Sequence, residues 1–568
     1  MAENKWVKKE YPVSELNSLM NEYNYSRPIA LSLLARGVDT STVENYFCST
    51  LKNLSSPYRL PDTENAVKRI WKAIKSDEHI LIHGDFDVDG ITGSAMLLWV
   101  LKENGANASV FIPQRLDSGY GFTADSLDSA LLTYKCNLLL TVDCGITSIE
   151  AVDRANELGI DVIITDHHEQ GTSLPKAKYI INPKIHTDLK DLQCLAGVGV
   201  AFKLAHAIIN YGHEHGLLYK KIDLTEILDL VCLGTVADIV PLLGENRILT
   251  RYGLKVLSKQ LRPGVRALCE IVGLTSKMKS SDIAFKLAPL INAAGRLGDP
   301  KTAFQLLTTT SMVEAMSLAK KLKEYNIQRR TQEYEIVSEA QMQIKATLDT
   351  DLISSILVYG EGWHQGVIGN VASRIAREYN RPSIVLTIID GQAYGSGRSC
   401  ANINLVEVLT ESAELLSRFG GHPMAVGLSL SAEFIKDLGK KFEHTVSQKV
   451  TSEELIPQFE YEGEVFISEL DDVFFQELES LEPFGHGNPH PVYKLTSLTV
   501  PYSTTAGKSH LKGYLRDRNY NSISFIYFNA CEIALPEQPW DILAIPQTNF
   551  YNGAKIPQLK IVDIKPSL

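Results

Sequence analysis

The chain has 568 residues, a length that at roughly 150 residues per domain predicts three or four domains. Hydrophobic residues make up 44 % and charged residues 22 %, a globular balance that excludes a wholly disordered or fibrous protein. The formal net charge of −11 excludes a histone-like DNA binder held by bulk positive charge, but not a local basic groove or a metal site built from acids.

The sequence shows no signal for membrane insertion or export. No run of about 18 uncharged apolar residues predicts a membrane span, and the N-terminal MAENKWVKKEYPVSEL lacks the apolar core of a signal peptide. The eight cysteines are scattered without a Cys-x-x-Cys pair, which favours free thiols over a zinc ribbon or a disulfide scaffold. We therefore expect a cytoplasmic protein that does not bind membranes.

Residues 1–55 are expected to form short helices, and residues 56–310 an α/β domain. From residue 79 onward, short apolar runs alternate with helical patterns: HILIHG, then ITGSAMLLWVLKENG; NLLLTVDCG, then SIEAVDRANELG; and DVIITDHH. This alternation indicates a parallel sheet. Ligands of such sheets bind at the carboxyl ends of the strands, which here read HGDFDVDG, DCG and DHH.

A long, charge-rich helix without Pro or Gly is predicted over residues 311–348, and its composition suits a connection between two domains. Residues 349–450 show a second, smaller α/β pattern, with the strand-like runs SILVYG and SIVLTIID around the helical VIGNVASRIAREY. We therefore predict a second α/β domain after the long helix.

Residues 451–568 no longer show the α/β alternation of the preceding domain. Five strand-like runs, VYKLTSLTV, SHLKGYLR, SISFIYF, WDILAI and QLKIVDI, predict a small β-barrel of the OB type. From Pro491 to Leu568 the net charge is +3, and tyrosines are interleaved with the basic residues, among them Tyr493, Tyr514, Tyr520, Tyr527 and Tyr551. Such a surface suits single-stranded nucleic acid, although β-propensity alone would also place tyrosines in strands and core.

Acids and histidines gather at the ends of the apolar runs. HGDFDVDG contains His83, Asp85, Asp87 and Asp89, which share one face if the segment is extended. Asp143 ends LLLTVD, Asp166, His167 and His168 follow DVIIT, and Asp238 lies in LGTVADIVPL. A single acid of this kind is often a helix cap, but four such strings in one α/β unit indicate a site where cations neutralise the charges. Oxygen and imidazole ligands suit Mn²⁺ or Mg²⁺.

These strings resemble the four motifs of the DHH phosphoesterase superfamily, in the same order. Six further strings resemble the branch of that superfamily formed by single-strand-specific 5′→3′ DNA exonucleases: PQRLDSGYGF (113–122), INAAGRLGDP (291–300), GWHQGVIGNVASR (362–374), YGSGRS (394–399), GGHPMAVG (420–427) and LEPFGHGNP (481–489). The motifs extend from about residue 55 to 490, and the barrel beyond them also fits.

The resemblance implies a centre with two divalent ions, Mn²⁺ or Mg²⁺. One ion would be held by His83, Asp87 and Asp143, and the other by Asp89, Asp143, His167 and Asp238, so that Asp143 bridges them. His168 would face the scissile phosphate and Asp166 would orient its neighbours. The resemblance does not fix the role of Asp85. It is either an acid that hydrogen-bonds to the metal ligands or a base that orients a water molecule.

The resemblance also implies contacts to DNA. Arg115, Ser396 and Arg398 are candidates for a 5′-phosphate pocket, with a surface arginine in a turn as the alternative. Arg296 is a second candidate for a phosphate contact. His364 and His422 lie in Gly-rich strings and are expected to line the cleft, unless they are structural histidines. The string GVG (197–199) lacks the third glycine of a dinucleotide fingerprint, so we expect no nucleotide there.

The sequence therefore predicts a metal-dependent exonuclease that degrades single-stranded DNA from a 5′ end, in recombination and repair. We expect a monomer, with a helicase and a single-strand-binding protein as possible partners. One alternative is a DHH-family phosphodiesterase acting on short oligonucleotides or cyclic dinucleotides, but the barrel and the motifs beyond residue 350 argue against it. The other is a non-catalytic DNA-binding replication factor, against which the complete set of candidate ligands argues.

Overall fold

The computed structural model describes residues 4–114, 121–218, 220–275, 277–347, 353–400, 403–507, 509–532, 534–551 and 554–567. The chain folds as two compact units. One comprises residues up to 7, 296–298 and 321–459, and the other residues 8–295, 299–320 and 460–568. Within the described residues, no helix is both long and apolar enough to cross a membrane.

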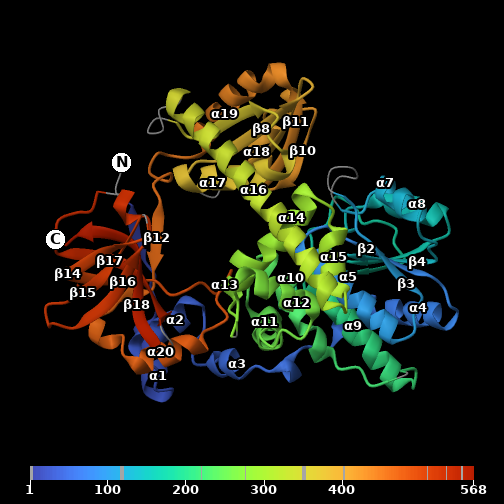
Figure 1. Cartoon of the computed structure of the whole chain (residues 1–568), viewed down its shortest axis with the longest axis horizontal. Helices are drawn as coiled ribbons and strands as arrows, with labels where there is room; N and C mark the ends of the chain where they lie inside the picture. Colours follow the sequence, from blue (N-terminus) through green and yellow to red (C-terminus); the bar gives the residue numbers. More distant parts are fainter. Residues whose placement is uncertain are drawn as a thin grey trace. The chain divides into compact units, whose positions relative to one another are not determined.

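The larger unit contains a five-stranded parallel sheet, of which β2, β3 and β4 are labelled in Figure 1. Its order is β3 (Ala108–Phe111), β2 (Ile80–Gly84), β4 (Leu138–Val142), β5 (Asp161–Thr165) and β6 (Tyr179–Ile181). Residues of β2, β4 and β5 pack against α7 (Ala124–Leu131) and α8 (Ile149–Glu157), and α5 (Val88–Glu103) and α9 (Gly197–Glu214) also contact the sheet. Because helices bury the strands, the runs ILIHG, LLLTV and DVIIT are almost wholly apolar, and the predicted parallel sheet is confirmed.

Further helices of the larger unit contact α5, α9 or one another. They are α4 (Thr63–Lys75), α10 (Leu228–Ala237), α11 (Gly244–Leu257), α12 (Pro263–Val272), the short α13 (Ser280–Asp282), a π-helical turn at Ile283–Leu287, α14 (Ala288–Leu297) and α15 (Lys301–Thr308). The predicted long helix is confirmed as α16 (Met312–Thr347), which begins in the larger unit and ends in the smaller one.

The smaller unit is built on a second, mixed sheet. Its order is β10 (Arg418–His422), β11 (Ala425–Ser431), β9 (Gln392–Arg398), β8 (Ser383–Ile389) and β7 (Ile356–Glu361). Only the β7–β8 pair is parallel. The helices are α17 (Gln365–Tyr379), α18 (Leu405–Thr410) and α19 (Ile435–Lys449), and apolar residues of α16 pack against α17. The predicted second α/β domain is thus confirmed.

The C-terminal strands close into a five-stranded barrel in the order β14 (Tyr493–Ala506), β15 (His510–Arg516), β16 (Ser522–Tyr527), β18 (Ala554–Pro566) and β17 (Trp540–Tyr551). Pairing of β17 with β14 completes the closure, and β13 (Gly463–Glu464) adds to β14. All five strand-like runs of the sequence became barrel strands, which confirms the OB-type fold.

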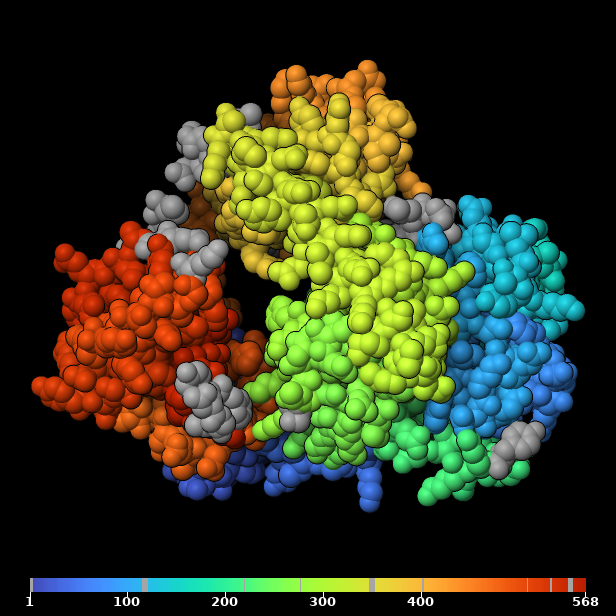
Figure 2. Space-filling view, in the orientation of Figure 1, coloured from blue at the N-terminus to red at the C-terminus, as the bar shows by residue number. Residues whose placement is uncertain are grey.

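The N-terminal residues pack on the barrel. β1 (Lys5–Lys8) pairs with β12 (Gln458–Tyr461), and α1 (Val13–Glu22) and α2 (Arg27–Ala35) share a core with α20 (Asp472–Ser480) and the barrel. α3 (Val43–Cys48) also contributes to this core. Figure 2 shows the blue N-terminal residues against the orange and red C-terminal ones. The sequence predicted these short helices but not their partner.

Candidate metal centre

The HGDFDVDG segment begins in a strand, passes through a turn and ends in a helix. His83 lies in β2, Asp85 and Asp87 lie in the turn after it, and Asp89 lies in the first turn of α5. The Asp87 side chain caps α5 by accepting the backbone N–H groups of Asp89 and Gly90, at 2.9 and 3.1 Å. The expectation that four side chains of an extended segment share one face was therefore wrong, because the helix begins at Val88. The acids instead converge through the turn.

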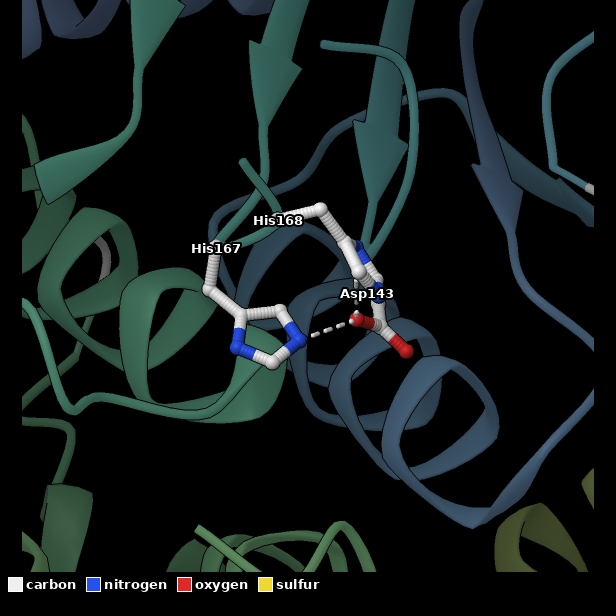
Figure 3. Close-up of side chains that lie close together, drawn as sticks. All are labelled: Asp143, His167 and His168. Atoms are coloured by element: carbon white, nitrogen blue, oxygen red, sulfur yellow. Dashed lines mark ion pairs between the residues drawn. The ribbon is translucent and has the colours of Figure 1, made fainter. Parts of the chain in front are cut away.

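Asp143 directly follows β4, and Asp166 directly follows the neighbouring β5, so both lie at the same edge of the sheet. Figure 3 shows the rings of His167 and His168 directed at the Asp143 carboxylate, with both marked ion pairs ending on Oδ1 of that carboxylate. His167 Nε2 lies 3.1 Å from Asp143 Oδ1 and 3.6 Å from Asp238 Oδ2. Asp238 ends helix α10 rather than a strand.

Three groups of side chains offer ligand atoms that lie within 4.8 Å of one another. They are Asp89, His167 and Asp238; Asp85, Asp87 and Asp143; and Asp143, His167 and His168. Two of the groups contain Asp143 and two contain His167, so the groups form one continuous cluster. The first group matches three of the four ligands expected for one ion.

The electrostatics of this cluster favour a cation. Burial, followed by the nearby Asp89 carboxylate, raises the pKa of Asp143 well above its usual range. Burial and neighbouring carboxylates also raise the pKa of Asp238 to about 9 and the pKa values of Asp85 and Asp89 to about 7. Each acid thus lacks a positive partner sufficient to keep it ionised, which is what a bound divalent ion supplies.

Unpartnered ligand atoms support the same conclusion. Asp143 Oδ1, Asp238 Oδ2 and both ring nitrogens of His167 are buried and make no hydrogen bond within the described residues. Burial lowers the pKa of His167 to about 3, so its ring is neutral and offers a lone pair. Buried polar atoms without partners are costly, and carboxylate oxygens with imidazole nitrogen are donors that Mn²⁺ and Mg²⁺ accept. The residues fit such ions.

His83 is placed differently from the other candidates. It is fully buried, its Nε2 lies 3.0 Å from Ser126 Oγ, and its ring packs edge-on against Phe122. Burial lowers its pKa to about 4. Among the described residues His83 joins none of the three groups, whereas Asp85 joins Asp87 and Asp143. Ser126 gave no signal in the sequence, because it belongs to a helix distant along the chain.

Asp166 and His168 form a hydrogen-bonded pair beside the cluster. Asp166 Oδ1 accepts His168 Nδ1 at 2.8 Å and the His167 backbone N–H at 2.7 Å, and its Oδ2 accepts the Ile146 N–H at 2.9 Å. Although burial opposes it, the hydrogen bond and charge of Asp166 raise the pKa of His168 to about 9. The His168 side chain is 56 % exposed. In the metal-free protein, the raised pKa therefore favours an accessible, protonated imidazolium.

The DNA-binding candidates of the smaller unit lie around the start of α17. Arg398 Nη1 donates to Ser396 Oγ at 2.8 Å, and a Cβ at Gly369 would lie 3.3 Å from Arg398 Nη2. Arg296 Nη1 donates to the Gly366 carbonyl at 3.1 Å. The structure thus brings Ser396, Arg398 and Arg296 to one helix.

Of the remaining candidates, one lies at the start of the same helix and another on a strand of the smaller unit. His364 caps α17 by accepting the Gly366 N–H, and His422 is exposed at the end of β10. Arg115 lies outside the described residues.

The tyrosines of the barrel divide into two sets. Tyr493 is buried and its hydroxyl donates to the Pro28 carbonyl at 2.8 Å, whereas Tyr514 and Tyr520 are 51 % and 80 % exposed. Tyr527 is half-buried, and the side chain of Tyr551 lies outside the described part. The exposed Tyr502, which was not among the tyrosines predicted to contact nucleic acid, lies directly opposite Tyr514 on the neighbouring strand.

Three family descriptions match the chain. They are the DHH family, N-terminal domain, over residues 79–235; the DHHA1 domain, over 350–448; and the RecJ OB domain, over 461–563. The first covers the parallel sheet with most of the acid and histidine cluster, the second the smaller sheet, and the third the barrel.

Whole-chain comparisons agree. The single-stranded-DNA-specific exonuclease RecJ of Bacillus subtilis is 33 % identical over 98 % of this chain and 70 % of that protein. The RecJ of Escherichia coli is 34 % identical over 82 % of each chain. The crystal structure of Thermus thermophilus RecJ in complex with Mn²⁺ covers 99 % of this chain and 80 % of its own, with a TM-score of 0.84 and 29 % identity. The chain therefore belongs to the RecJ family, whose matched members are named single-stranded-DNA-specific exonucleases.

Proposed function

We propose that this protein is a metal-dependent exonuclease that hydrolyses the phosphodiester bonds of single-stranded DNA in the 5′→3′ direction, in recombination and DNA repair. The observation that carries the proposal is the buried cluster around Asp143, in which Asp143 Oδ1, Asp238 Oδ2 and the ring nitrogens of His167 make no hydrogen bond within the described residues, in a chain of the RecJ family. The relatives are named for this activity, and one of them was crystallised with Mn²⁺ and with Mg²⁺.

In the proposed centre, Asp89, Asp143, His167 and Asp238 hold one ion, and Asp143 with Asp87 and either Asp85 or His83 holds the other. Asp85 is favoured because its carboxylate lies close to those of Asp87 and Asp143, whereas His83 Nε2 is within hydrogen-bond distance of Ser126 Oγ. Divalent ions bound there supply positive charge that stabilises the attacking and leaving oxygens of a phosphodiester. Asp143 is the shared ligand in this assignment.

We propose that His168 donates a proton during hydrolysis and that Asp166 orients His168. Asp166 accepts from Nδ1 of His168, which leaves Nε2–H of the imidazolium free to contact a phosphate oxygen or to protonate the leaving oxygen. The hydrogen bond and charge of Asp166 raise the pKa of His168, which favours the protonated imidazolium as a proton donor. Asp166 acts by orienting the ring and stabilising its charge.

Ser396, Arg398, Arg296 and Arg115 are proposed to contact DNA phosphates, the first two and Arg115 at the 5′ end, with His364 and His422 lining the DNA path. The barrel face with Tyr502, Lys512, Tyr514 and Arg516 is proposed to hold the strand by stacking and phosphate contacts. A cytoplasmic monomer that works with a helicase and a single-strand-binding protein is the corresponding cellular proposal.

Digestion of long single-stranded DNA labelled at either end tests the function. With Mn²⁺, a 5′ label should be released as a short product before the 3′ label, and EDTA should stop the reaction. A duplex of the same sequence should resist. Cleavage restricted to short oligonucleotides or cyclic dinucleotides would indicate the smaller-substrate phosphodiesterase, and binding without cleavage would indicate a replication factor.

Preference for a 5′-phosphate tests the proposed end pocket. A 5′-phosphorylated strand should be cut faster than a 5′-hydroxyl strand. Arg398→Ala should reduce the ratio of the two cleavage rates by about 10–100-fold, since a charge-assisted hydrogen bond contributes about 1.5–3 kcal/mol. If the variant keeps the full preference, another part of the protein holds the end.

A further inference from the structure

The first turn of α9 contacts the acid cluster through its backbone. The Gly197 N–H donates to Asp89 Oδ2 at 2.6 Å, and the Val198 N–H donates to Asp89 Oδ1 at 2.8 Å. These residues belong to the GVG string, which has no nucleotide-binding pattern. The backbone of this string instead binds a carboxylate, that of Asp89 in α5.

Asp89 completes the start of α9 from outside that helix. The residue at the N-cap is Ala196, which has no side chain able to accept the free N–H groups of the first turn. The fully buried Asp89 carboxylate accepts two of them, one on each oxygen. Two bonds to a rigid backbone fix the orientation of both carboxylate oxygens, and the positive end of the helix dipole favours their charge.

Gly197 also lies against Asp143. A Cβ at position 197 would lie 2.6 Å from both the Cβ and Oδ1 of Asp143, closer than real Cβ atoms approach. Rotating the Asp143 side chain cannot relieve the contact with its own Cβ. The Asp143 backbone is also held, with φ +62° and its N–H bonded to the Thr165 carbonyl at 3.0 Å. Only a glycine at 197 allows this approach.

We infer that Gly197 is a positioning residue of the metal centre: its N–H orients Asp89, and its missing side chain lets Asp143 lie beside the start of α9. The inference rests on the ligand assignment proposed above, in which Asp89 belongs to one ion and Asp143 to both. One glycine thus sets the distance between the two carboxylates that share an ion.

Two matched Gly→Ala substitutions in the same helical turn test this role. At Gly199 a Cβ would meet only the flexible side chain of Leu195, at 3.3 Å, so Gly199→Ala is the control. Alanine is at least as good a helix former as glycine, so neither change should weaken α9 through its backbone. Gly197→Ala should bind Mn²⁺ about 10–100-fold more weakly by calorimetric titration, the usual effect of disturbing a residue that orients metal ligands. Gly199→Ala should bind it as the unchanged protein does.

Binding of single-stranded DNA in EDTA should be equal in all three proteins, which separates a displaced metal centre from general damage. Asp143→Asn, titrated in parallel, separates this inference from the ligand assignment. If Asp143→Asn loses Mn²⁺ while Gly197→Ala keeps full affinity, the positioning role is wrong and the assignment stands. If Asp143→Asn keeps full affinity, the assignment itself fails.

A second measurement uses the unchanged protein and needs no variant to fold. Hydrogen exchange of the peptide containing Gly197 and Val198 should slow severalfold when Mn²⁺ is added, because a bound ion holds Asp89 against their N–H groups. Peptides from the barrel should exchange at the same rate with and without Mn²⁺. Unchanged exchange of the α9 peptide at saturating Mn²⁺ would overturn the inference.

Discussion

A buried ion pair fastens the N-terminal helices to the segment that leads into the barrel. Arg36 Nη1 lies 2.9 Å from Glu462 Oε1, and the two side chains are 2 % and 6 % exposed. Arg36 also donates to Asn488 Oδ1 at 2.7 Å and to two backbone carbonyls. Arg36→Ala would therefore leave Glu462 buried and without its cation, a change that typically costs about 3–5 kcal/mol.

The Lys9–Glu460 pair provides a matched control. It joins the residue after β1 to β12 at 3.2 Å, two residues from Glu462, but its side chains are 33 % and 63 % exposed. An exposed pair contributes only about 0–1 kcal/mol, so Lys9→Ala should have little effect.

Calorimetry of thermal unfolding gives the measurement. At roughly 2 °C per kcal/mol, Arg36→Ala should lower the melting temperature of the transition that contains the barrel by about 6–10 °C, and Lys9→Ala by at most about 2 °C. The double variant Arg36→Met/Glu462→Leu should recover part of the loss, because most of the cost is an unpaired buried charge. Equally small shifts of the melting temperature in both single variants would show that the buried Arg36–Glu462 pair contributes no more than the exposed pair.

Three further predictions concern the site and the barrel. Asp143→Ala should reduce hydrolysis to background while binding of single-stranded DNA largely survives; near-normal turnover would contradict the bridging role. In metal-free protein, His168 should titrate near pH 9 by NMR, and Asp166→Asn should lower that pKa. Because the folded-state pKa of His168 is raised, its stabilising contribution should be complete below about pH 6.5 and lost as pH rises through about 9. On the barrel, Lys512→Ala should make the affinity for single-stranded DNA less steeply dependent on salt, by a slope of roughly 0.7. Tyr514→Ala should weaken binding by about 1–3 kcal/mol at an unchanged slope; unchanged binding in both variants would exclude this face from the DNA path.

The sequence predicted the features that depend on local pattern. Apolar runs such as LLLTV and DVIIT must be strands buried on both faces, and parallel strands bring Asp143 and Asp166 to one edge. The five barrel strands were equally visible as alternating runs bounded by turns. Short-range periodicity was sufficient in each case.

Features that depend on packing between distant segments were not predictable. The N–H groups of Gly197 and Val198 meet Asp89 across more than a hundred residues, and nothing in a GVG string identifies that partner. Likewise, α1 and α2 have apolar faces, but the pattern does not say that α20 and the barrel cover them. This packing also means that removing residues 460–568 would expose the core of α1 and α2, so single substitutions on the barrel face are the sharper test of DNA binding.

Crystallography with Mn²⁺, using anomalous scattering to locate the ions, would show whether Asp143 bridges two ions. We expect two peaks that share Asp143 as a ligand, one beside Asp89, His167 and Asp238, and the other beside Asp87 with Asp85 or His83. The second peak would also decide between those two residues. Fully occupied Mn²⁺ peaks elsewhere in the protein, with none in contact with Asp143, would contradict the account.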